Sequence, residues 1–113
     1  QIEQVLVNLL RNALESMADN PAAQRQLIVR TELLPTPAVR VVVRDNGRGL
    51  ESDELNRLFE PFFTTKTDGM GMGLSISHSI VEAHGGRMEA VPNSDRGMTF
   101  QFTLPVVRKG GSR

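Results

Sequence analysis

Apolar residues near the start of the chain recur at spacings of three and four positions. This stripe consists of Ile2, Val5, Leu6, Leu9, Leu10, Ala13, Leu14 and Met17. Such spacing predicts an amphipathic helix with one buried side. Asp19, Asn20 and Pro21 form a cluster typical of a helix end, so we expect the helix to stop there.

Four later segments alternate apolar with polar residues, which is typical of strands. They cover residues 26–34, 38–45, 87–91 and 98–104, with turn residues between the members of each pair. In the second segment the alternation predicts one face buried, formed by Val39, Val41 and Val43, and one mostly wet, formed by Arg40, Val42 and Arg44. In the last segment Met98, Phe100, Phe102 and Leu104 make a continuous apolar face.

Two further helices complete the predicted fold. The first is short, covers residues 52–59, and has Ser52 as its expected cap. The second covers residues 72–83 and should end at His84, Gly85 and Gly86. Helices that precede and separate two strand pairs predict an α+β two-layer sandwich with helices on one sheet face. We expect one domain over residues 1–107 and a flexible tail over 108–113.

Composition removes several functional classes. The 113 residues suffice for one domain, and 13 basic residues balance 13 acidic ones. We therefore expect no nucleic-acid partner and no nonspecific binding to anionic surfaces. The chain has no cysteine, which excludes disulfides and thiolate chemistry and fits a reducing compartment. Because the sequence opens in mid-pattern, we expect it to be part of a longer protein.

Asn8 and Asn12 lie four positions apart, on one face of the first predicted helix. Amide oxygens are suitable ligands for a Mg²⁺ ion that is also bound by phosphates and water. Alternatively, the two asparagines simply face solvent. Asp45 ends a strand before a glycine turn, where its carboxylate could accept a hydrogen bond from a ligand amine or could bond its own backbone in an Asx turn.

The stretch DGMGMGLSIS has glycine at positions 69, 71 and 73, at the entrance to a predicted helix. Glycines there can expose amide N–H groups to phosphate, and the helix dipole also favours an anion. The alternative is an irregular flexible loop. A P-loop is excluded because no Gly-Lys-Ser/Thr follows, and a dinucleotide-binding βαβ unit is excluded because no strand immediately precedes.

The order of the motifs is more specific than any single one. NLLRNALESM, DNGRGL, FEPFFTTK, GMGMGLSIS and GMTFQFTLP follow one another along the chain. Here the sequence resembles the catalytic ATP-binding domain of sensor histidine kinases, in the gyrase and chaperone ATPase superfamily with the Bergerat fold. These segments look like its N, G1, F, G2 and G3 boxes. FEPFFTTK and EAHGG are most similar to the oxygen-sensing and nitrogen-regulating subclass with PAS domains.

The resemblance implies a mixed, mostly antiparallel sheet, about three helices on one face, and a site for ATP and Mg²⁺. Asn12 would ligate Mg²⁺ with support from Asn8, Lys66 would meet the γ-phosphate, and Asp45 would accept the adenine amine. The implied nucleotide contacts are Asn8, Asn12, Asp45, Gly47, Gly49, Phe59, Phe62, Thr65, Lys66, Gly69, Gly71, Gly73, Leu74 and Thr99. A mobile lid would include Phe59, Phe62, Thr64, Thr65 and Lys66, and the glycines would let it hinge.

The implied reaction is transfer of the γ-phosphate to a histidine on a separate dimerisation domain of the same protein. ATP-hydrolysing relatives carry a glutamate where this chain has Asn8, which cannot act as a general base, so a chaperone-like or topoisomerase-like ATPase is disfavoured. A nucleotide-sensing module without phosphotransfer stays open. We expect a cytoplasmic domain of a homodimeric kinase, free or membrane-attached, with a response regulator downstream. Glu15 and Met70 depart from residue types common in relatives.

Overall fold

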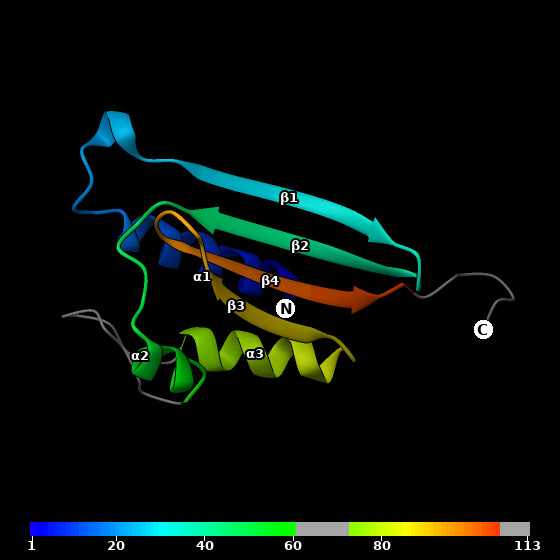
Figure 1. Cartoon of the computed structure of the whole chain (residues 1–113). Helices are drawn as coiled ribbons and strands as arrows, with labels where there is room; N and C mark the ends of the chain where they lie inside the picture. The colour runs from blue at the N-terminus through cyan, green and yellow to red at the C-terminus, as the bar shows by residue number, and fades with distance from the viewer. Residues whose placement is uncertain (61–72, 107–113) are drawn as a thin grey trace, which may run out of the picture.

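The computed structural model of the protein describes residues 1–60 and 73–106 (Figure 1). Its elements, in chain order, are α1 (Ile2–Ser16), a 3₁₀ turn (Ala22–Gln24), β1 (Leu27–Leu34), β2 (Ala38–Asp45), α2 (Ser52–Asn56), α3 (Gly73–Ala83), β3 (Arg87–Pro92) and β4 (Met98–Pro105). The four predicted strands and three predicted helices are therefore present. The predicted tail, residues 108–113, lies outside the described residues.

The strands form one sheet in the order β1-β2-β4-β3. Within the described ranges every strand pair is antiparallel, including the central pair β2–β4, so the implied mixed sheet is antiparallel throughout this part of the chain. Helix α1 packs on β2, and α3 packs on β3 and β4 and against α1. Figure 1 shows both helices on the same face of the sheet. The predicted two-layer α+β sandwich is confirmed.

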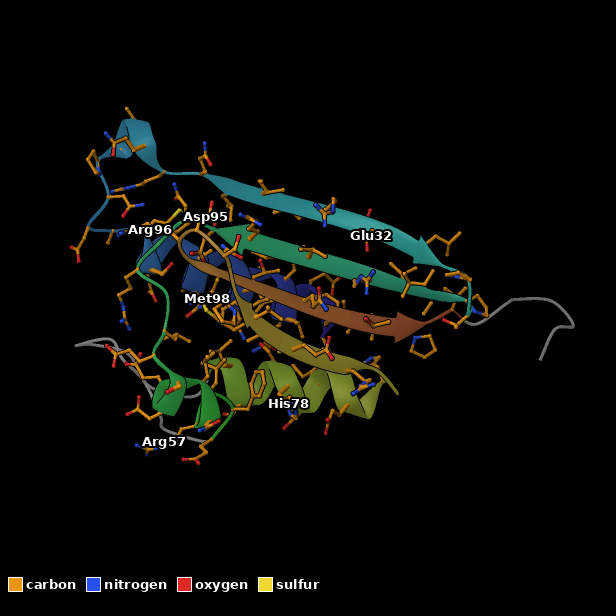
Figure 2. The ribbon with its side chains drawn as sticks, in the orientation of Figure 1. Glu32, Arg57, His78, Asp95, Arg96 and Met98 are labelled. Atoms are coloured by element: carbon orange, nitrogen blue, oxygen red, sulfur yellow. The ribbon has the colours of Figure 1, made fainter. Side chains whose placement is uncertain are left out.

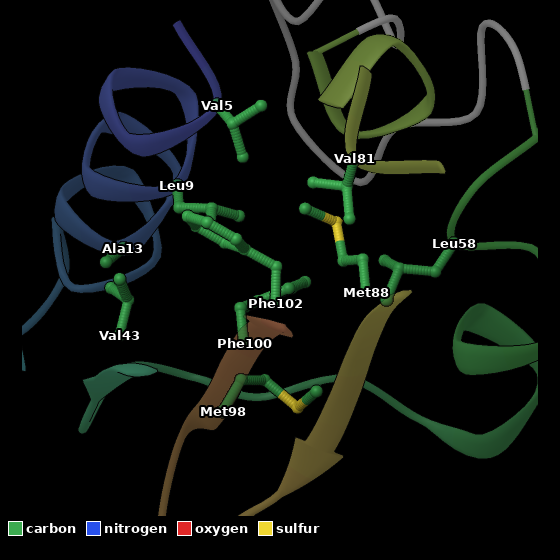
Figure 3. Close-up of a cluster of buried hydrophobic side chains, with 10 residues drawn as sticks. All are labelled: Val5, Leu9, Ala13, Val43, Leu58, Val81, Met88, Met98, Phe100 and Phe102. Atoms are coloured by element: carbon green, nitrogen blue, oxygen red, sulfur yellow. The ribbon is translucent and has the colours of Figure 1, made fainter. Parts of the chain in front are cut away.

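The core lies between this helical layer and the inner face of the sheet (Figure 3). Its buried members are Val5, Leu9, Ala13, Val43, Leu58, Val81, Met88, Met98, Phe100 and Phe102. The buried residues of α1 recur every four positions and those of β4 every two positions, so each element presents one apolar side to the other layer. The remaining side chains of both elements point away from this interface. Burial of these side chains supplies the main driving force for joining the two layers.

Two residues depart from the predicted burial pattern. Leu14 was predicted in the buried stripe of α1, but it is 55% exposed because the stripe narrows to the side that meets the sheet. Val42 lies on the open face that we predicted to be mostly wet, yet it is only 4% exposed. Its register partners are Arg30 on β1 and Gln101 on β4, and the stems of such long side chains cover an apolar neighbour.

The helix ends follow local hydrogen bonds. Ser52 is not the cap of α2: Glu51 holds that position, and its N–H donates to the Glu54 carboxylate at 2.9 Å. The helix also ends at Asn56 instead of Phe59. At the other helix, the predicted glycine stop is confirmed. Gly85 has φ +79°, and the N–H of Gly86 donates to the carbonyl of Val81, two residues before the helix end.

Strand β1 forms one edge of the sheet and carries several exposed apolar residues. Leu27, Ile28, Val29 and Leu33 are all exposed, and none of the described helices covers this strand on either face. The side chains of Leu27 and Val29 project from the same sheet face as Val43, because the register pairs Val29 with Val43. The apolar inner face of the sheet therefore continues beyond the area that α1 and α3 cover.

Two valines of α1 provide a matched test of this packing. Val5 is fully buried and Val7 is 49% exposed on the same helix. Val5→Ala should lower the free energy of unfolding by about 2 kcal/mol, from lost burial and the cavity left behind. Val7→Ala should change it by less than about 0.5 kcal/mol. Urea denaturation of both variants checks the packing, and equal losses would contradict it.

Candidate functional site

Several segments that are far apart in the chain lie at one end of the molecule. Figure 1 shows the last residues of β2, the β3–β4 turn, the C-terminal end of α1, helix α2 and the first turn of α3 at this end, on the left of the view. The segment after β2 is attached to α1 directly, because the N–H of Arg48 donates to the carbonyl of Ser16 at 3.2 Å. The motifs are thus gathered by the fold, although they are far apart in the chain.

Asp45, the final residue of β2, is buried to 2% exposure. One carboxylate oxygen, Oδ1, accepts hydrogen bonds from the N–H of Gly47 at 2.8 Å and the N–H of Met98 at 3.3 Å. Within residues 1–60 and 73–106, no hydrogen bond reaches its second oxygen, Oδ2. The Asx turn and the ligand-accepting role are therefore compatible: Oδ1 fixes the turn, and Oδ2 keeps its capacity to accept a hydrogen bond from an amine.

Asn8 and Asn12 occupy the border of the buried side of α1, and both are half-buried. The amide nitrogen of Asn8 donates to the hydroxyl of Ser77 at 3.0 Å and to the carbonyl of Gly73 at 3.4 Å. Asn8 therefore does not simply face solvent, because it ties α1 to the first turns of α3. Since its nitrogen is engaged, its oxygen is the atom left to meet a cation.

The residues present fit a metal ion only if a bound substrate completes its coordination. In the described part of the chain, no group of three or more His, Cys, Asp or Glu residues is arranged to hold a metal. The amide oxygens of an asparagine pair supply neutral donors alone. Such donors suit Mg²⁺, which binds through few protein ligands when phosphate oxygens and water provide the rest.

Two glycines of the DNGRG turn have structural requirements of their own. A side chain on Gly47 would collide with Ser16 at the end of α1, so the close approach of helix and turn requires glycine. Gly49 adopts φ +75°, a left-handed conformation, while its surroundings leave ordinary van der Waals space. The resemblance implied that both glycines contact the nucleotide, and the contact of Gly47 with α1 is a separate reason for its identity.

Helix α3 begins at this end of the molecule with Gly73 and Leu74. Among the described residues, nothing lies within 4 Å of the position that a side chain on Gly73 would take, so these residues leave the first turn of α3 open to an approaching ligand. Leu74 is half-buried and packs against the core. Phe59 stacks on His78 of α3, with ring centroids 4.5 Å apart, and so fixes the chain just before residue 61. The labelled His78 in Figure 2 lies on this helix.

The side chain of Thr99 lies on the opposite face of the sheet from the side chain of Asp45. Its neighbours Met98 and Phe100 point into the core, so its own side chain points to the open face of the sheet. There its hydroxyl donates to the side-chain oxygen of Asn93 at 2.5 Å. The implied direct contact of Thr99 with the nucleotide therefore lacks support from its position, and Met98 occupies the inward position beside Asp45.

The remaining predicted contacts lie outside the described residues. They are Phe62, Thr65, Lys66, Gly69 and Gly71, together with the rest of residues 61–72. The lid and the γ-phosphate contact of Lys66 accordingly stay predictions. The two histidines of the described chain have local partners: His78 also lies 3.4 Å from the Glu82 carboxylate, and Nδ1 of His84 lies 2.8 Å from the carbonyl oxygen of Ile80.

The sequence pattern indicated the β3–β4 turn only as a connection between two strands and did not indicate its contacts with β2. Figure 2 shows Asp95 and Arg96 on this turn, close to the point where β4 begins at Met98. Asp95 accepts a 3.1 Å ion-pair contact from Arg44 of β2. The pKa of the Asp95 carboxyl is lowered below its ordinary value. The main cause is a hydrogen bond from the backbone N–H of Arg96, followed by one from the backbone N–H of Asp95 and by the charge of the Arg44 guanidinium. The only signal in the sequence was the density of Asn, Ser, Asp and Gly over residues 93–97.

Comparison with known proteins agrees with the geometry. Residues 1–108 match the family model described as histidine kinase-, DNA gyrase B- and HSP90-like ATPase. The chain belongs to this family. The predicted resemblance to histidine kinase catalytic domains is thereby confirmed, and the chain is homologous to sensor kinases of two-component signalling.

The relatives give the scale of this homology. The sensor protein FixL of Bradyrhizobium diazoefficiens is 54% identical over 106 residues, covering 94% of this chain and 21% of FixL. The C4-dicarboxylate transport sensor protein DctS of Rhodobacter capsulatus is 46% identical, covering 96% of this chain and 16% of DctS. The chain thus spans about a fifth of the length of such relatives.

Solved structures share the fold as well as the sequence. The nucleotide-free catalytic domain of histidine kinase ThkA has a TM-score of 0.78 and 39% identity, covering 92% of this chain and 65% of that one. Full-length ShkA in complex with AMPPNP has a TM-score of 0.75 and 29% identity, covering 90% of this chain and 20% of that one. The first of these structures is described as the catalytic domain of a histidine kinase.

Two glycines offer a matched test of the turn that surrounds Asp45. Gly97 has φ +91°, and a side chain there would strike the carbonyl of Asp45, whereas a side chain on Gly73 would meet none of the described residues. Gly97→Ala should lower the free energy of unfolding by about 2 kcal/mol or more. Gly73→Ala should be neutral or slightly stabilising because alanine favours the helix. Thermal denaturation distinguishes them, and a tolerated Gly97→Ala would refute the contact.

Proposed function

We propose that this chain binds ATP with Mg²⁺ and presents the γ-phosphate to a histidine on another domain of the same protein. The observation that carries the proposal is the carboxylate of Asp45, buried at the end of β2 and fixed through Oδ1. A buried carboxylate with one oxygen available favours a ligand that brings an N–H donor. The adenine 6-amino group is such a donor, and guanine presents an acceptor at the same position.

The rest of the site supports binding of a polyphosphate. The exposed first turn of α3 offers amide N–H groups and the positive end of a helix dipole. The side chain of Asn8 is bonded to this turn, so the side-chain amides of Asn8 and Asn12 and the N-terminus of α3 would act on the same phosphate group. Bound Mg²⁺ would neutralise phosphate charge during transfer. Asn12, with support from Asn8, would hold it through amide oxygens.

Transfer to a histidine suits this set of residues better than hydrolysis. The residue one turn before Asn12 is Asn8, whose amide cannot remove a proton from water. An imidazole is itself a nucleophile, so the site must mainly orient the phosphate in line with the acceptor and neutralise its charge. In this proposal the acceptor lies on a dimerisation domain, the whole kinase is a homodimer, and a response regulator receives the phosphate.

The cellular setting belongs to the same proposal. None of the helices in the described ranges is both long and apolar enough to cross a lipid bilayer. We place the domain in the cytoplasm, where ATP and a response regulator are found together. The equal numbers of acidic and basic residues give no support to a nucleic-acid partner.

Removing the acceptor at Asp45 should weaken ATP binding. Asp45→Asn keeps an oxygen for the N–H groups of Gly47 and Met98 but turns Oδ2 into a donor that repels the adenine amine. We expect the dissociation constant for ATP, measured by calorimetry, to rise about 10- to 100-fold. Asp53→Asn, at an exposed site on α2, is the matched control and should bind normally. Unchanged affinity in Asp45→Asn would remove Asp45 from the site.

Phosphotransfer itself tests the function. The protein is mixed with a dimerisation domain that carries the acceptor histidine, together with radiolabelled ATP and Mg²⁺. We expect acid-labile label on that domain, lost when its acceptor histidine is changed to glutamine. Asn12→Ala should reduce the label at least about tenfold, because the metal loses a ligand. Tight ATP binding without any label would instead favour a nucleotide-sensing module.

A further inference from the structure

The β3–β4 turn holds the backbone of Asp45 through a single side chain, that of Asn93. We propose that Asn93 is a positioning residue, which fixes Asp45 so that its carboxylate can discriminate adenine from other bases. This inference rests on the proposed function, because it gives the buried carboxylate a ligand. It assigns a role to a turn residue that touches neither the predicted phosphate site nor the predicted metal ligands.

The hydrogen bonds of Asn93 use both ends of its amide. Its nitrogen donates to the backbone carbonyl of Asp45 at 2.8 Å and to the carbonyl of Arg96 at 2.9 Å. Its oxygen accepts from the hydroxyl of Thr99. The backbone N–H of Asn93 also donates to the carbonyl of Gly97, which closes the turn. Because three partners fix the amide, its direction toward Asp45 cannot change without breaking several bonds together.

A second contact holds the residue that follows Asp45. Arg96 donates from Nε to the carbonyl of Asn46 at 3.1 Å and from its terminal nitrogen to the side chain of Asn20 at 3.3 Å. Asn20 in turn donates to the carbonyl of Asn46 at 3.0 Å. The side chain of Asn46 bonds the backbone of Gln24 and Gln26. The loop after α1 and the β3–β4 turn therefore hold the peptide of Asn46 between them.

These contacts leave the carboxylate of Asp45 little freedom. Its Oδ1 is bound by the N–H groups of Gly47 and Met98, and its carbonyl is bound by Asn93. Gly97 packs directly on the same carbonyl, which is why a side chain there would collide with it. A hydrogen-bonding site discriminates between ligands only when its groups are held close to the productive geometry. Asn93 would supply that restraint from outside the binding surface.

The test compares two ligands that differ only at the adenine amine: ATP, and the triphosphate of purine riboside, which has hydrogen in place of the 6-amino group. The wild-type protein should prefer ATP. Asn93→Ala should weaken ATP binding about fivefold and leave the analogue unchanged, so that the preference collapses. A purely structural role would weaken both ligands alike. Gln101→Ala, which breaks a bond to Glu89 on the open face of the sheet, is the matched control and should keep the preference.

The outcomes separate this inference from the proposed function. If the wild-type protein binds both ligands equally, the proposed hydrogen bond between the adenine amine and Asp45 is wrong. A wild-type preference that survives in folded Asn93→Ala would overturn the role of Asn93 alone. The double variant Asp45→Asn with Asn93→Ala should bind ATP no more weakly than Asp45→Asn, since Asn93 acts through Asp45. Additive losses would contradict that route.

A milder variant covers the case in which Asn93→Ala does not fold. Thr99→Val keeps the strand propensity and the shape of the side chain but removes the hydroxyl that holds the oxygen of Asn93. It should reduce the preference for ATP over the analogue about twofold to threefold. If Thr99→Val keeps the full wild-type preference while Asn93→Ala is unfolded, Asn93 serves the turn alone and the proposal is overturned.

Discussion

Burial of one side of α1 against the sheet is the constraint on which the rest of the structure depends. Val5, Leu9 and Ala13 are almost completely buried in contact with the strands and with α3. Their burial fixes the rotation of α1 about its own axis. That rotation sets Asn8 and Asn12 at the border of the interface, where Asn8 bonds the first turns of α3. A rotation that buried a different stripe would remove the amides from the site, so core packing and chemistry are coupled.

Three loops share hydrogen bonds at the end of the candidate site that carries Asp45. Asp45 is the centre of this arrangement, with partners in the turn that follows it and in the β3–β4 turn. Arg96 extends the network to the loop after α1. Buried polar networks of this kind are costly when incomplete, and among the described residues no buried side-chain polar atom lacks a partner.

Much of the fold could be predicted from the sequence because its signals are local. The period in α1, the alternation in β2 and β4, and the glycine stop after α3 depend on residues that are neighbours along the chain. Errors occurred where a distant partner decides the outcome. Val42 is covered by residues of two adjacent strands. The error at the cap of α2 is different, because it is local: Glu51 and Ser52 are neighbours, and the hydrogen bond of the Glu51 N–H to Glu54 places Glu51 at the cap.

The sequence by itself determined the family and the elements and proposed the candidate site residues, because ordered motifs with fixed spacing require no knowledge of contacts. Only the tertiary structure decided what those residues touch. It joined Asn8 to Ser77 and Asp45 to Met98 across separations of 69 and 53 positions. It also turned Thr99 away from Asp45 and brought Asn93 to its carbonyl. The physical reason is that strand pairing and helix packing set these contacts, and no local pattern encodes them.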